Sequence, residues 1–351
     1  MYKIPSLKEI KENTENNNHL FEVVSLFAGG GGSSTGYRMA VGKVLAINEF
    51  IEEAQKTYAA NYPKTYIFKQ DVRKLTGNDI LNQIGKGKKE LDILDGSPPC
   101  SAFSSAGSGS KGWGKDKKYS DSSQSNVEDL FFEYIRILRD IEPKIFIAEN
   151  VSGLAKGDCK GYLNHILREL KASCYHVECK QLDAKWLGVP QSRNRLIFVG
   201  VRNDLMKSEY KGLLHPKPLK SIVTLEQAFN GLAFTNQDRI ETDISKYAIY
   251  KELVKINPLE QSKKYFSLTK ESKKHYSNCI TAKTGCLSAA KPMHWDNRAF
   301  TVNEVKRIMS VPDDYILTGT YQQKVERLGR MVAPFMMRAV AENIYKLVLK
   351  K

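Results

Sequence analysis

The stretch Leu91-Asp92-Ile93-Leu94-Asp95-Gly96-Ser97-Pro98-Pro99-Cys100 is the most informative part of this chain. Its apolar first half predicts a short buried strand, and two prolines end that strand just before a cysteine. Because proline fixes its own backbone and cannot donate to a sheet ladder, the thiol is presented at a stiffened strand end. Taken alone, this stretch predicts a reactive thiol and nothing more.

Predicted strands alternate with predicted helices around this stretch. Further buried strands are predicted at residues 21–26, 43–48, 145–148 and 195–201. Apolar residues recur at helical spacing over residues 128–141. The alternation predicts an α/β fold, with an open, mixed but mostly parallel sheet covered by helices on both faces. Ligands of such sheets bind beyond the carboxyl ends of the strands.

This alternation stops in a stretch rich in Lys and Ser that contains His215-Pro216-Lys217-Pro218. We therefore predict a large domain over residues 1–201, a smaller irregular domain over residues 202–297, and a return to the large domain over residues 298–351. The first 18 residues are expected to form a polar N-terminal tail.

Local signals refine the end of the chain and the segment after the cysteine. Thr301 and Glu304 form a T-x-x-E capping box that opens a helix at residues 302–309. One further helix is expected within residues 325–349. Residues 104–125, rich in Ser, Gly and Lys, predict a mobile loop.

Composition limits the class of protein. The 54 Lys and Arg against 39 Asp and Glu give a net charge of +15, which attracts polyanions such as nucleic acid, although a Lys-rich surface without such a partner is an equal alternative. No apolar run approaches the roughly 20 residues of a membrane span, so we expect a cytoplasmic protein. Six cysteines without a C-x-x-C pair argue against a disulfide framework and a metal site.

A glycine-rich turn follows the first predicted strand, in Phe27-Ala28-Gly29-Gly30-Gly31-Gly32. Glycines at this position let the backbone approach a ligand, although Ser34 replaces the third glycine of a dinucleotide fingerprint. Glu49 ends the next strand, where a carboxylate can accept hydrogen bonds from ribose hydroxyls, and Asp71 follows a third strand. The alternative is a glycine turn and two surface acids.

Three charged residues are expected at the same sheet edge as Cys100. Glu149 ends the strand at residues 145–148, where its carboxyl can hold or share a proton, or simply cap the next turn as Asn150 could. In Gln191-Ser192-Arg193-Asn194-Arg195, alternation puts both arginines on one face. They could bind a phosphate or a base carbonyl, or be ordinary surface residues.

Taken together and in this order, these motifs resemble those of the cytosine-5 DNA methyltransferases. Near the C-terminus, residues 298–304 match the family's R-x-x-T-x-x-E helix. In Leu328-Gly329-Arg330, an arginine stands where the family commonly has the asparagine that helps to hold the cofactor's methionine end. Ser101 replaces a common glutamine. The resemblance covers residues 21–344 except the segment 202–297.

The resemblance implies the Rossmann-like fold of methyltransferases that use S-adenosylmethionine. It places Phe27 against the adenine, Glu49 on the ribose and Asp71 on the adenine amino group. The expected cofactor-binding residues are Phe27, Ala28, Gly29, Gly31, Glu49, Asp71, Pro99, Leu130 and Val332. No metal is implied.

The resemblance also implies a mechanism and a DNA partner. Cys100 is the expected nucleophile at C6 of cytosine, Glu149 acts at ring N3, and Arg195 contacts O2, while Arg193 supports the loop or the DNA backbone. The cytosine leaves the duplex to be reached. Residues 202–297 are then the target-recognition domain. Lysines at positions 263, 264, 270, 273 and 274 are expected to contact phosphates rather than bases, and those at 111, 115, 117 and 118 could meet phosphates or be solvated linker charges.

Two alternatives remain open from the sequence. One branch of the family methylates transfer RNA and carries a Cys-Phe-Thr, to which Cys279-Ile280-Thr281 is similar. A DNA-binding regulator without catalysis is the other, against which intact Cys100, Glu149 and Arg195 argue. The compact length is typical of a bacterial or phage enzyme, expected to be monomeric, with a companion restriction endonuclease as a candidate partner.

Overall fold

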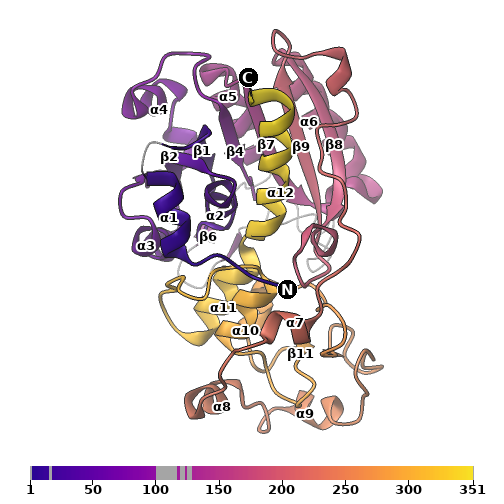
Figure 1. Ribbon diagram of the computed structural model, residues 1–351. Helices are drawn as coiled ribbons and strands as arrows, with labels where there is room; N and C mark the ends of the chain where they lie inside the picture. The colour runs from indigo at the N-terminus through magenta and orange to yellow at the C-terminus, as the bar shows by residue number, and fades with distance from the viewer. Residues whose placement is uncertain (1, 16–17, 100–116, 119–122, 125–128, 351) are drawn as a thin grey trace.

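A computed structural model describes residues 2–15, 18–99, 117–118, 123–124 and 129–350 (Figure 1). A seven-stranded sheet with the order β3-β2-β1-β4-β7-β9-β8 forms the large domain. Its strands are β1 (Phe21–Leu26), β2 (Gly42–Asn48), β3 (Tyr66–Phe68), β4 (Ile93–Gly96), β7 (Ile145–Val151), β8 (Tyr175–Asp183) and β9 (Asn194–Arg202). β9 is antiparallel to both of its neighbours, β7 and β8, and all the other pairs of the sheet are parallel. The predicted mostly parallel α/β sheet is confirmed.

Helices cover both faces of this sheet. One face packs on α1 (Leu7–Glu15), α2 (Gly32–Met39), α3 (Glu52–Asn61) and α12 (Pro334–Ile344), and the other packs on α4 (Gly77–Ile84), α5 (Leu130–Ile141) and α6 (Lys160–Ala172). Alternation along β7 divides its side chains, so that Ile145 and Ile147 face α12 while Phe146 and Ala148 face α5. Because both faces are covered, the strands are almost continuously apolar.

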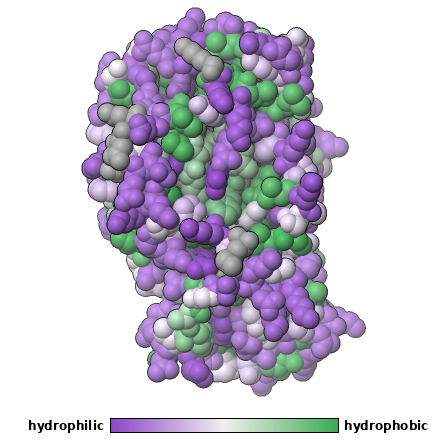
Figure 2. Space-filling model, in the orientation of Figure 1, coloured by the Kyte–Doolittle hydropathy of each residue, from purple (hydrophilic) through white to green (hydrophobic). Residues whose placement is uncertain are grey.

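The segment between β9 and α10 (Val302–Ile308), predicted to be a smaller domain, contains short elements. Its elements are α7 (Leu225–Phe229), α8 (Asn236–Thr242), α9 (Ala248–Leu253), β10 (Thr269–Lys270) and β11 (Pro292–Met293). A cluster around Leu253, Leu268 and Met293 is separate from the core of the sheet, whereas α7 packs on that core through Leu225. In Figure 1 this segment lies below the sheet, with α10 and α11 (Tyr321–Arg330) between the two. Figure 2 shows that its visible surface is mostly hydrophilic.

Capping and ion pairing explain why regular structure resumes at α10. The Thr301 side chain accepts from the Glu304 amide at 3.0 Å and the Glu304 carboxylate accepts from the Thr301 amide at 2.7 Å, which confirms the predicted capping box. Arg298 binds the same carboxylate with two guanidinium nitrogens at 2.7 and 2.8 Å. This bidentate pair holds the chain just before α10 against the first turn of that helix.

Several local expectations differ from the structure. The supposed polar tail contains α1, whose Leu7 and Ile10 are buried and whose first turn is held by Asp314, 2.7 Å from the Leu7 amide. The single helix expected near the C-terminus is two helices, because the chain extends at residues 331–333 and Pro334 begins α12.

The segment between β4 and α5 is described only in part. A short antiparallel pair, β5 (Lys117–Lys118) with β6 (Ser123–Gln124), lies within the expected loop. The rest of residues 100–128 lies outside the described residues, and with it Cys100 and the lysines at 111 and 115. None of the described helices is long and apolar enough to cross a membrane.

Gly200 provides a test of packing in the sheet. It pairs with Phe146 across β7 and β9, and a Cβ built on it would lie 1.9 Å from the Phe146 ring. We expect Gly200→Ala to lower the free energy of unfolding by about 1–3 kcal/mol through overpacking. The control Gly161→Ala, in α6 with open space around it, should raise it by about 0.5–1 kcal/mol. Urea denaturation measures both changes. Equal changes in the free energy of unfolding for Gly200→Ala and Gly161→Ala would contradict this account.

Candidate functional site

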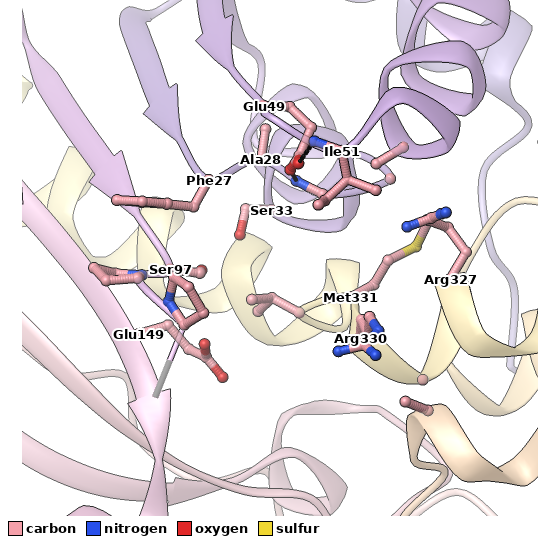
Figure 3. A pocket seen from close by; sticks show the side chains of 18 of the residues that line it. Phe27, Ala28, Ser33, Glu49, Ile51, Ser97, Glu149, Arg327, Arg330 and Met331 are labelled. Atoms are coloured by element: carbon pink, nitrogen blue, oxygen red, sulfur yellow. Dashed lines mark hydrogen bonds between the residues drawn. The ribbon is translucent and has the colours of Figure 1, made fainter. Parts of the chain in front are cut away.

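A pocket of about 430 Å³ lies at the carboxyl ends of β1, β2, β4 and β7. In Figure 3, Phe27, Ala28 and Glu49 bound it above, Ser97 and Glu149 below, and Arg327, Arg330 and Met331 on the remaining side. The predicted site residues that line it are Phe27, Ala28, Gly29, Glu49, Pro99, Glu149, Arg193, Arg195 and Val332. Segments distant in sequence therefore meet in one cavity.

Glu49 holds the glycine loop at the top of the pocket. Its carboxylate accepts from the Gly29 amide at 2.6 Å and from the Ile51 amide at 2.7 Å. Burial raises the pKa of Glu49 above its usual value, and these amides oppose the rise. A carboxylate has about four acceptor positions, so further ones remain for the hydroxyls of a ligand. Positive φ angles at Phe27 and Gly29 shape the turn around it.

Backbone and side-chain contacts hold the Pro-Pro segment beside β7. The Asn150 amide group donates to the Pro98 carbonyl at 3.3 Å, and its oxygen accepts from the Val151 amide at 2.8 Å. Asn150 thus anchors the strand end rather than capping a helix. Pro99 lines the pocket, and Cys100, the residue after it, lies outside the described residues.

Glu149 and Arg195 form an ion pair inside the pocket. Glu149 lies within β7, two residues before its end, and not after the strand as expected. Val151 pairs with Arg195 across β9, so Glu149 and Arg195 are diagonal neighbours on one face. The Arg195 Nε and Glu149 Oε1 atoms are 2.6 Å apart, and both side chains are largely buried. No other hydrogen bond or ion pair of this carboxylate is found within the described part of the chain.

Arg193 has a different position from the one expected. It precedes β9, is 2% exposed, and donates to the carbonyls of Ile280 at 2.8 Å, Gly329 at 3.0 Å and Met331 at 2.8 Å. Burial, and then repulsion from Arg195, lowers the pKa of Arg193 to about 10, so it stays cationic at neutral pH. Arg193 is therefore buried and held by these carbonyls while it lines the pocket, and its expected role toward the loop or the DNA backbone stays a prediction.

Three expected cofactor residues do not line the pocket. Asp71 binds the amide and guanidinium of Arg73, both at 3.0 Å, and Val72 lines the pocket in its place. Leu130, the first residue of α5, is fully buried in the core. Gly31 faces Tyr315, whose hydroxyl would lie 2.6 Å from a Cβ built there.

Sequence reasoning missed other lining residues. Phe50 and Ile51 directly follow Glu49. Their position just after a strand end could have indicated that they line the pocket. Arg327 and Met331 flank the Gly329-Arg330 motif at helical spacing, and Lys283 comes from the smaller domain. Among the described residues, no cluster of metal ligands is present.

Asp95 lies in β4 close to the site. Its carboxyl accepts from the Ser25 hydroxyl at 2.6 Å and from the Tyr37 hydroxyl at 3.0 Å. Burial raises the pKa of Asp95 to about 7, and the nearby charge of Glu149 adds to the rise. The residue therefore titrates in a range where enzymes are assayed.

Comparisons with known proteins identify the class and then the family. Solved structures with this fold include mutant DNMT2 of Spodoptera frugiperda, with a TM-score of 0.67 and 20% identity over 93% of this chain and 99% of that one. The methyltransferase EhMeth of Entamoeba histolytica has a TM-score of 0.62 and 14% identity over 93% and 98%. The fold is the Rossmann-like methyltransferase fold. Residues 21–346 match the model of C-5 cytosine-specific DNA methylases, so the chain belongs to that family.

Curated relatives extend over nearly the whole chain. Type II methyltransferase M1.HphI of Haemophilus parahaemolyticus is 28% identical over 335 residues, 92% of this chain and 86% of that protein. Type II methyltransferase M.Bsp6I of a Bacillus strain is 28% identical over 346 residues, 94% and 100%. The predicted family and enzyme class, a DNA cytosine methyltransferase, are confirmed.

The pKa of Asp95 predicts a pH-dependent contribution to stability. An unfolded Asp titrates near 3.9, so between roughly pH 4 and 7 the folded state holds the extra proton. The stability of the native protein relative to Asp95→Asn should therefore fall as pH rises through this range, by an amount on the order of a few kcal/mol, and level off above it. The free energy of unfolding of both proteins, measured by denaturation from pH 4 to 8, checks this. A constant difference between them over that range would contradict the prediction.

Proposed function

We propose that this protein transfers the methyl group of S-adenosylmethionine to C5 of a cytosine in a specific sequence of duplex DNA. One observation carries the proposal: the Glu149–Arg195 ion pair, the glycine loop with Glu49, and the Pro98-Pro99 segment line the same pocket. A site for a nucleoside and a site for a base would then open onto each other.

The residues present fit S-adenosylmethionine. Phe27, Phe50 and Val72 offer apolar surface for the adenine, and Glu49 has acceptor positions for the ribose hydroxyls. Gly29 and Gly30 have no side chain, so their backbone itself lines the pocket and a ligand can approach it closely. When bound, the cofactor supplies an electrophilic methyl group.

The proposed chemistry needs a nucleophile because C5 of cytosine is too electron-poor to attack a methyl group directly. The Cys100 thiolate adds to C6, which makes C5 nucleophilic. Glu149 binds at ring N3 through the oxygen that Arg195 leaves free, and holds the proton that offsets the charge arriving on the ring. After transfer, a water removes the C5 proton, and the electrons of that C–H bond re-form the ring double bond and expel the Cys100 sulfur from C6. Arg195 orients O2.

The DNA partner is inferred from charge and exposed side chains. The target base must leave the stack, which requires a few kcal/mol of unstacking. In the smaller domain Lys263, Lys264, Lys273 and Lys274 are exposed and could meet phosphates. Lys270 is buried, and burial lowers its pKa. We therefore remove Lys270 from the lysines expected to contact phosphates.

The other two readings are less favoured. Cys279, which suggested a transfer RNA substrate, lies 3.5 Å from a guanidinium nitrogen of Arg193, so its position has a structural explanation. The intact Glu149–Arg195 pair argues against an inactive regulator. Because the relatives are named Type II methyltransferases, we also propose that the enzyme protects DNA from a companion restriction endonuclease.

Cytosine methylation on random-sequence duplex DNA, read at single-base resolution, tests the reaction. With S-adenosylmethionine, we expect methylated cytosines in one sequence context, and none with Cys100→Ala. Cys174→Ala, at an exposed cysteine outside the pocket, should retain the native pattern. Methylation that persists in Cys100→Ala would remove this nucleophile. Methylation of transfer RNA alone would overturn the choice of substrate.

Glu149→Gln separates chemistry from binding. The amide keeps the size of the side chain but cannot hold a proton at N3, so single-turnover methylation should slow by roughly 100-fold or more. The dissociation constant for DNA should change little, because the ion pair lies inside the pocket. An unchanged single-turnover rate would contradict the role proposed for Glu149.

A further inference from the structure

One buried cation in the pocket is unexplained by the steps above. Arg327, on α11, lines the pocket and is 5% exposed. Within the described part of the chain, its guanidinium makes no side-chain hydrogen bond or ion pair. It acts at a distance on Glu49, where its charge opposes the rise in pKa that burial causes.

Packing brings this guanidinium close to the glycine loop. A Cβ built on Gly30 would lie 2.7 Å from Cγ and 3.0 Å from Cδ of Arg327, and 2.4 Å from Cε of Met331. The arginine stem therefore fills the space that a side chain at position 30 would take. Just beyond lies the first turn of α2, where backbone N–H groups favour negative charge.

A second cation stands on the same wall. Arg330 also lines the pocket and is held by Glu326, with its Nε 2.9 Å from a carboxylate oxygen. Figure 3 shows Arg327 and Arg330 on the side of the pocket opposite Ser97 and Glu149. Glu326 pairs directly with Arg330, whereas among the described residues Arg327 has no carboxylate at ion-pair distance and interacts only with the more distant Glu49.

A buried cation without a partner is costly, and a ligand that brings an anion to it removes that cost. Resting on the proposed function, we infer that Arg327 binds the α-carboxylate of the methionine part of S-adenosylmethionine. The sulfonium and the α-ammonium are both positive, so the same charge repels them. The methyl-bearing sulfur is thereby directed away from α11 and toward Pro99 and Glu149, where the base would lie.

Calorimetric titration tests this inference without turnover. The two probes are S-adenosylhomocysteine and its decarboxylated analogue, which keeps the adenosine, the thioether and the amine. The native protein should bind the analogue roughly tenfold or more weakly, because a charge-assisted hydrogen bond is lost. Arg327→Met should bind both probes with similar affinity, and Arg327→Lys should keep part of the preference.

Arg338→Met is the matched control. Arg338 is paired with Glu342 at the same i,i+4 spacing as Arg330 with Glu326, with its Nε 2.7 Å from the carboxylate, and it does not line the pocket. It should keep the full preference for S-adenosylhomocysteine. Thermal unfolding without ligand should show Arg327→Met at least as stable as the native protein, because an unpaired buried charge has been removed.

Three outcomes would overturn the inference. If Arg327→Met keeps the native preference, the arginine does not bind the carboxylate. If Arg327→Met weakens DNA binding but leaves both probe affinities at native values, the guanidinium binds a phosphate of the DNA instead. If the native protein binds both probes equally, the inference fails while the proposed function stands, whereas failure to bind either probe overturns both.

Discussion

The site depends on one buried cation, Arg193. Its guanidinium donates to Ile280 at the base of the smaller domain and to Gly329 and Met331 at the end of α11. A buried charge is costly unless hydrogen bonds compensate it, so these bonds favour the meeting of the three segments around Arg193. The wall of the pocket that they form is thereby fixed against the carboxyl edge of the sheet. Close packing of Gly329 on the Thr281 backbone strengthens the same junction.

This junction turns an ordinary strand-end crevice into a pocket with two chemically distinct ends. At one end, Glu49 and the glycine loop offer acceptors and bare backbone, which would suit the proposed nucleoside. At the other, the Glu149–Arg195 pair offers a carboxylate and a guanidinium, which would suit the proposed cytosine ring with its donors and acceptors. Pro98, tied to β7 by Asn150, and Pro99 line the same pocket. Methyl transfer needs donor and acceptor in contact, and this arrangement can provide it.

Sequence patterns predicted the parts of the structure that local periodicity encodes. Buried strands such as β7 are nearly continuous in apolar residues, and α5 has clear helical spacing. The strand β8 was missed because only two of its nine residues are buried at the sheet edge. Motif order identified Glu149 and Arg195, which the structure brings into contact. The burial of Arg193 and the place of Arg327 depend on contacts between distant segments, which no local pattern encodes.

Trapping the covalent intermediate tests the central claim most directly. In a duplex whose target cytosine is replaced by 5-fluorocytosine, C5 has no proton to lose after methyl transfer, so the bond from sulfur to C6 cannot break. With S-adenosylmethionine, we predict a complex that survives denaturing electrophoresis, and a peptide mass that places the modified nucleotide on Cys100. A modified nucleotide on another residue, or methylation of normal DNA with no trapped complex on the fluorinated duplex, would contradict the account.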